Sequence, residues 1–149
     1  YEIHERLVGS EMCIRDRDGA TVKVKGLAVK TGETAKVEAN IIEVTPEILK
    51  MMVVGALNTG GEISSRYTEI ISNQKISEGD YIENLGFVGK TLDGRDIVVI
   101  FEYALCTSGL EIEGKNKEAT VIKATFECYA DLTNNPVTLP YHIYYPKTI

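Results

Sequence analysis

The chain has 149 residues, and its 16 basic and 22 acidic side chains leave a formal net charge of −6 at pH 7. This length suffices for one domain with a buried core but is short for two. A mildly acidic chain without a basic run argues against tight binding to nucleic acid or to an anionic membrane surface.

Residues 1–17 resemble a translated sequencing-library adapter more than a protein segment. From Arg6 onward the letters follow an adapter reading frame position by position, and the residues before it leave room for a variable index. The alternative is a genuine amphipathic arm at the N-terminus. A segment that comes from a sequencing or fusion scar does not belong to the native fold. We therefore expect 1–17 to be non-native and loosely packed. Residues 18–149 are then one β domain that lacks its native N-terminus.

The first clear strand signal covers residues 34–44. Its apolar side chains, Ala35, Val37, Ala39 and Ile41, alternate with polar ones. A period of two is typical of a strand with one buried and one solvated face.

A helix is predicted over about residues 46–57. Thr45 can cap its free amide groups, Pro46 suits the first helical position, and Glu47 complements the positive end of the helix dipole. The apolar stripe that follows predicts a helix packed against the core.

Residues 84–92 and 95–103 are expected to form a hairpin. They flank Asp93-Gly94, a dipeptide typical of a two-residue type I′ turn. Within the second arm, residues 97–101 are continuously apolar. Such a run predicts a central strand covered on both faces.

Further strands are predicted at residues 67–71, 110–113, 119–130 and 141–145, with a polar loop at 72–80. One helix among about seven strands indicates a mainly β fold. The expected architecture is an antiparallel β-sandwich or partly closed barrel with one flanking α-helix.

Side chains with catalytic or metal-binding chemistry are scattered. Cys106 and Cys128 lack metal-ligand spacing, and reduced thiols near the core are favoured over a disulfide. Glu111 and Glu113 share one strand face, where neighbouring acids and lysines favour a solvated charged surface over a two-carboxylate glycosidase site. His142 accompanies no nucleophile motif and is interpreted as a packed or interface residue. We predict no catalytic residue, no cofactor and no metal.

An ordered set of short motifs resembles the tail tube (major tail) proteins of long-tailed phages and prophages, especially those of Firmicutes. Each motif alone is ordinary turn or cap chemistry, and their order along nearly all of residues 18–149 carries the likeness. The matching motifs are Gly26-Leu27, TGETA at 31–35, EVTPEIL at 43–49, GKTLDG at 89–94, SGLEIEGKNKEATVIKATFECYAD at 108–131 and IYYPK at 143–147.

The resemblance implies a structural virion protein rather than an enzyme. Subunits of this family form hexameric rings that stack into a tube around the tape measure protein, and DNA passes through the lumen without specific binding. Expected partners are copies of this chain, the tape measure and other tail proteins, with no membrane. Assembly is expected in the bacterial host cytoplasm and the final location in the virion tail. The tube of a phage-derived contractile particle fits equally.

Two polar segments, 58–66 and 72–80, are predicted to be longer than most connections between strands. Connections of this length usually have a function. We interpret them as contacts between stacked or neighbouring subunits. The residues chosen to represent them are Asn58, Arg66, Ser72, Lys75 and Asp80.

A monomeric β-sandwich binding module, for instance one that recognises a glycan, is the alternative from another class. It predicts an exposed aromatic platform. The chain has no Trp, and its three Phe residues lie in predicted strands. The composition therefore favours the structural subunit.

Overall fold

A computed structural model describes residues 4–6, 10–16, 22–61, 63, 65–114, 116, 118, 120–133 and 138–147. The described residues confirm the predicted mainly β, antiparallel class with one flanking helix, and their strands do not close into a barrel. The elements are β1 (His4–Arg6), β2 (Ser10–Asp16), β3 (Ala28–Ile41), α1 (Pro46–Val53), β4 (Gly55–Asn58), β5 (Glu69–Ser72), the 3₁₀ helix η1 (Glu78–Asp80), β6 (Ile82–Lys90), β7 (Asp96–Cys106), β8 (Glu111–Glu113), β9 (Val121–Cys128) and β10 (Tyr141–Tyr144).

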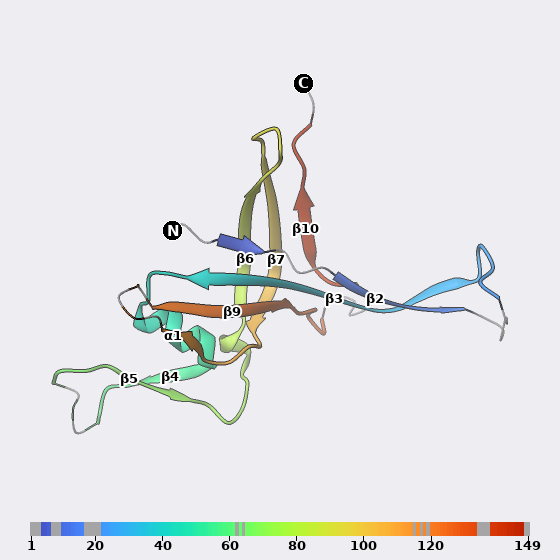
Figure 1. Cartoon of the computed structure of the whole chain (residues 1–149). Coiled ribbons are helices and arrows are strands. Elements are labelled where there is room, and N and C mark those ends of the chain that lie inside the picture. The colour runs from blue at the N-terminus through green and yellow to red at the C-terminus, as the bar shows by residue number, and fades with distance from the viewer. Residues whose placement is uncertain are drawn as a thin grey trace.

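Strand β7 joins two layers of the sandwich. Near its end, residues 104–106 pair with β9, which in turn pairs with β3 and β8. Earlier residues of β7 lie between β6 and β10. Figure 1 shows β6, β7 and β10 running across the direction of β3 and β9. Helix α1 contacts β4, β5 and β7. The apolar faces of the two layers meet where they cross.

The core follows the predicted alternation. Val37 of β3 is 1% exposed and lies opposite Phe126 of β9. Every second residue of β9, and of β3 from Ala35 onward, is buried, whereas the residues between them are exposed or half-buried. The buried set from these two strands is Ala35, Val37, Ala39, Ile41, Ile122, Ala124, Phe126 and Cys128.

Strand β3 begins and ends earlier than the predicted 34–44. Its first half pairs with β2, from Ser10 opposite Ala35 to Asp16 opposite Ala28. This two-stranded ribbon extends away from the body in Figure 1. Residues 28–34 of β3 are exposed or half-buried. No buried face therefore marks them in the sequence, and only the pairing makes them a strand.

The adapter-like segment was expected to pack loosely. Its described parts instead pair along one edge of β3, β1 opposite residues 38–40 and β2 opposite the first half of the strand. The side chain of Ile14 nevertheless stays 63% exposed. The described parts of the segment therefore contribute backbone pairing to both halves of β3.

The helix begins as predicted but is shorter than residues 46–57. The Thr45 hydroxyl accepts the amide of Ile48 at 3.3 Å, and Pro46 is the first helical residue. Val54 then takes a left-handed conformation with φ 49°. The next residue, Gly55, lies so close to β5 that a Cβ would sit 2.3 Å from the Ile71 carbonyl oxygen. Pairing of β4 with β5 therefore ends the helix.

The hairpin lies where it was predicted, but its turn is not type I′. A type I′ turn needs positive φ at both central residues, and only Gly94, with φ 80°, has it. The Gly94 amide donates to the Thr91 carbonyl at 2.9 Å, and the Thr91 amide to the Arg95 carbonyl at 2.8 Å. This is a three-residue loop ending in a left-handed glycine.

The prediction that residues 97–101 are covered on both faces is wrong for one face. Val99 and Phe101 are buried, whereas Val98 and Ile100 on the opposite face are only half-buried. Strands β6 and β10 flank β7 at its edges, and no described layer fully covers this second face.

The remaining strands lie close to their predicted positions. Strand β5 starts two residues later than the predicted 67–71 and ends one residue later. The polar loop at 72–80 contains η1, in which the Asp80 carboxylate accepts the Ser77 amide at 2.8 Å. Ten described strands replace the predicted seven, because β1, β2 and β4 carry no alternating pattern of their own.

Glu33 links the ribbon to β10 and gives the fold a pH dependence. Its carboxylate accepts hydrogen bonds from Lys30 and Tyr141, and these lower its pKa below the usual 4.5. The folded chain thus binds this proton less readily than the unfolded chain. Stability from Glu33 is complete above about pH 4.5 and is lost as pH falls through the lower folded pKa.

We expect Glu33→Gln to flatten this acid-dependent loss. The check is the urea-unfolding free energy of both chains at about pH 6 and about pH 3. Asp80, Asp93 and Asp131, whose pKa values are also lowered, stay in both chains and cancel in the comparison. If the free energy of unfolding fell equally between the two pH values in both chains, Glu33 would not be the source of the pH dependence.

Candidate assembly surfaces

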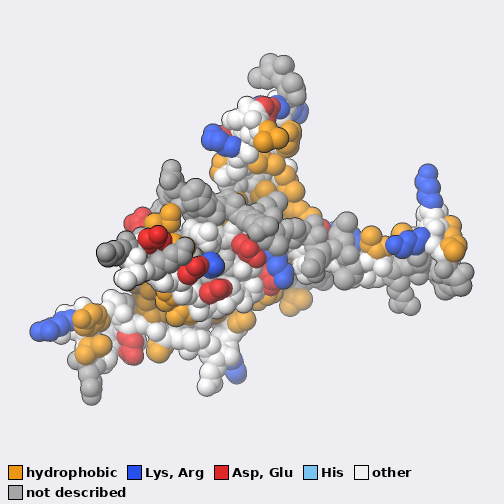
Figure 2. Space-filling model, in the orientation of Figure 1, with side chains coloured by type: hydrophobic (Ala, Val, Ile, Leu, Met, Phe, Trp, Pro, Cys, Tyr) orange, Lys and Arg blue, Asp and Glu red, His pale blue; other side chains and the backbone are white. Residues whose placement is uncertain are grey.

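The sheet of β6, β7 and β10 projects from the body and has two unlike faces. One face points into the core, where the Phe101 ring meets Phe87 at 5.7 Å and Tyr141 at 6.4 Å between centroids. On the other face Val88 and Tyr144 lie opposite Val98. Val88 is 61% and Tyr144 56% exposed, and apolar side chains cover this projection in Figure 2. Apolar side chains that lie together on a solvent-facing sheet face are typical of an interaction surface.

The tip of the β6–β7 hairpin is tied together by its own polar groups. The Thr91 hydroxyl donates to the Asp93 carboxylate and accepts the Arg95 amide at 3.1 Å. The Arg95 guanidinium reaches Asp93 at 2.6 Å and the Pro146 carbonyl at 3.4 Å. The hydroxyl of Thr91, followed by Arg95, lowers the pKa of Asp93. Leu92, at 111% of its reference exposure, is left in solvent at the apex.

The β4–β5 hairpin and the following loop carry all five predicted contact residues. Asn58 donates to Glu69 at 2.6 Å and accepts the Gly60 amide at 3.1 Å, while the Ser72 hydroxyl donates to the Val53 carbonyl at 3.4 Å. Arg66 and Lys75 are exposed, and Asp80 belongs to η1. The five residues thus lie on one hairpin and the loop that follows it, but they do not converge on one point. Their role in assembly stays a prediction.

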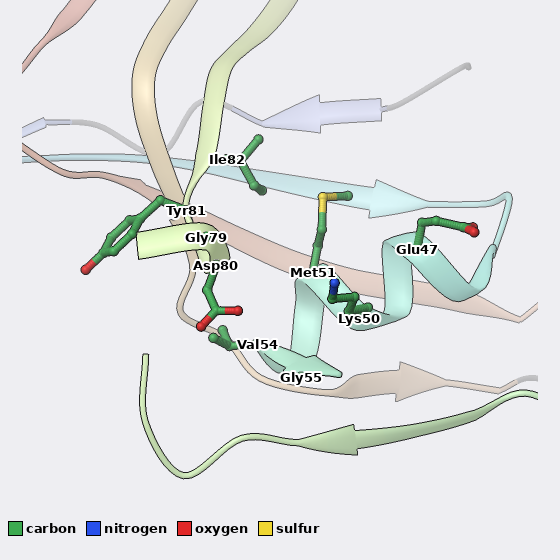
Figure 3. Close-up of a pocket in the computed structure, with 9 residues that line it drawn as sticks. All are labelled: Glu47, Lys50, Met51, Val54, Gly55, Gly79, Asp80, Tyr81 and Ile82. Atoms are coloured by element: carbon green, nitrogen blue, oxygen red, sulfur yellow. The ribbon is translucent and has the colours of Figure 1, made fainter. Parts of the chain in front are cut away.

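A hollow of about 270 Å³ lies between α1 and the start of β6. Apolar side chains of Met51, Val54 and Ile82 line it together with Tyr81, and charged groups from both sides stand at its margin (Figure 3). Its size falls below the roughly 300–1,000 Å³ of most small-molecule sites. The hollow therefore suits one or two side chains better than a cofactor.

The outer face of β3, β9 and β8 is polar and carries more acids than bases. Lys36 pairs with Glu127, and Lys123 with Glu113, each at 2.9 Å. The bond to Glu113 raises the pKa of Lys123, with weaker contributions from Glu111 and Glu38. Acidic side chains gather over this part of the body in Figure 2. Glu111 and Glu113 are exposed, as expected of a solvated charged face.

His142 lies on the exposed face of β10, 2.9 Å from Glu102 and 6.3 Å from the Tyr144 ring. Among the described residues no group of three or more His, Cys, Asp or Glu could hold a metal ion. In the same part of the chain, no helix is long and apolar enough to cross a bilayer.

Cys106 and Cys128 are free and buried, on neighbouring positions of β7 and β9. Burial raises the pKa of Cys128 to about 11. In a Cys13→Ser background, we expect the Cys128 thiol to label at least about a hundredfold more slowly in the folded chain than in urea at pH 8, because so little of this group is thiolate. The Cys106 side chain is 4% exposed, so its burial should slow labelling as well. A chromogenic disulfide reagent measures both rates. Rapid labelling of one thiol per folded chain would contradict this burial.

These features define a mainly β, antiparallel protein whose exposed apolar side chains include Val88, Leu92 and Tyr144 of the projecting sheet. Comparison of the chain with protein-family models, curated proteins and solved structures found no match. A functional proposal therefore rests on the sequence motifs and on these surfaces.

Proposed function

We propose that this chain is a structural subunit that self-assembles into hexameric rings, which stack as a phage tail tube. The observation that carries the proposal is the projecting sheet of β6, β7 and β10, which presents the exposed apolar side chains of Val88 and Tyr144 and two open edges to solvent. Among the described strands, β6 and β10 each pair only with β7. Monomeric proteins shield such edges, because unpaired strand edges promote aggregation. A neighbouring copy that covers the edges removes this risk.

The motifs of the sequence lie on the elements that such an assembly would use. GKTLDG forms the hairpin tip, EVTPEIL opens α1 beside the hollow, and IYYPK begins in β10. A cyclic contact between unlike surfaces of identical chains closes a ring, and a second contact stacks the rings.

The acidic outer face of β3, β9 and β8 fits passage of DNA without binding. Phosphates are repelled by a net negative surface and slide along it more readily than along a basic one. We propose that a face of this kind lines the lumen, around the tape measure protein before DNA passes. Replacing Glu38, Glu111 and Glu113 by Gln should then leave assembly intact and increase retention of DNA.

Sedimentation velocity over a range of protein concentrations tests the proposal. A self-assembling subunit yields large species above a threshold concentration, and their share rises steeply beyond it. A chain that sediments as a monomer at every concentration would refute self-assembly and leave the monomeric binding module as the better account.

A further inference from the structure

The hairpin tip presents one apolar side chain on a rigid support. Thr91, Asp93 and Arg95 form hydrogen bonds with one another, and Arg95 also donates to the Pro146 carbonyl after β10. Leu92 is the apolar residue between them, and its side chain is fully exposed. A preorganised tip loses little conformational entropy when it binds, so this leucine is well placed to enter a partner.

The hollow beside α1 has the properties of a receptor for such a side chain. It is apolar at Met51, Val54 and Ile82, and Met51 is 37% exposed and can adapt its shape. The charged groups at its margin, Lys50 and Glu47 among them, are of both signs. The tip likewise carries both signs within three residues of Leu92.

The tip and the hollow lie at opposite ends of one strand. Tyr81 and Ile82 line the hollow where β6 begins, and the tip follows Lys90, where β6 ends. Nine residues of extended strand separate the two by about 30 Å. They cannot meet within one chain, whereas a second copy can bring its tip to the hollow of the first. Such a head-to-tail contact repeats from copy to copy.

We propose that Leu92 of one copy inserts into the hollow between α1 and the start of β6 of a second copy. The charges complement this contact, because the tip carries Asp93 and Lys90 and the margin of the hollow carries Lys50 and Glu47. The inference rests on the proposed self-assembly and identifies one of its contacts.

Leu92→Asp tests the contact, with Leu132→Asp as the matched control. Leu132 is also a turn leucine, 88% exposed, and lies after β9. We expect the first variant to raise the concentration needed for assembly by about tenfold or more, since burial of one leucine changes an equilibrium constant by at least that factor. Unfolding by urea should be unchanged in both variants. Equal assembly of the two variants would overturn the inference.

Cross-linking separates this contact from the tube itself. In a Cys13→Ser background, copies bearing Leu92→Cys are mixed with copies bearing Met51→Cys, and mild oxidation should give a mixed disulfide dimer. Leu132→Cys replaces Leu92→Cys in the control and should give none. Tubes without the mixed dimer overturn the inference and leave the function standing. The mixed dimer without tubes supports the contact and refutes the tube, and the absence of both overturns both.

Discussion

Phe101→Ala is expected to lower the free energy of unfolding by about 3–5 kcal/mol, the usual cost of removing a buried aromatic ring. Phe101 is 1% exposed, and its ring contacts Phe87 of β6 and Tyr141 of β10. It therefore holds all three strands of the projecting sheet to the core. Most domains have only about 5–15 kcal/mol of total stability, so this loss removes at least about a fifth of the total.

Urea unfolding followed by circular dichroism measures this loss. The matched control is Val88→Ala on the opposite face of the same sheet, where the side chain is 61% exposed and truncation should cost about 0.5 kcal/mol or less. Equal losses in the two variants would show that the sheet has no anchored face.

Gly55→Ala is expected to destabilise the fold by about 1–3 kcal/mol, as overpacking at a tight contact does. The new Cβ would lie 2.3 Å from the Ile71 carbonyl oxygen and 2.8 Å from a methyl group of Val53. The carbonyl is backbone and cannot rotate away, so β4 and β5 must separate. Hydrogen exchange at the Ile71 amide should accelerate along with the loss of stability.

Gly86→Ala is the control for this substitution. Its Cβ would meet nothing within 4 Å, and its φ is not positive. Replacing glycine where the backbone suits alanine is neutral or stabilises by up to about 1 kcal/mol. A Gly55→Ala chain as stable as the Gly86→Ala chain would contradict the close approach of β4 to β5.

Features set by neighbouring residues could be predicted from the sequence. The start of α1 follows from Thr45 and Pro46, whose cap chemistry acts within one turn. The buried side of β3 and β9 follows from alternation alone. The end of α1 could not be predicted in this way, because it depends on the approach of Ile71 to Gly55 from a distant strand.

The surfaces were harder to predict than the core. The type I′ prediction considered Asp93-Gly94 alone, whereas the side chains of Thr91 and Arg95 determine the loop. The exposure of Leu92 could have been predicted from the sequence, because an apolar residue occupies a turn position that usually carries a polar one. The hollow could not have been predicted from the sequence, because α1 and the start of β6 come together only in the fold.

Electron microscopy of the purified chain at high concentration tests self-assembly into a tube most directly. The proposed function predicts hollow tubes or rings whose averaged end views have six-fold symmetry. Particles that remain single subunits at every concentration, or that assemble without a central lumen, would contradict it.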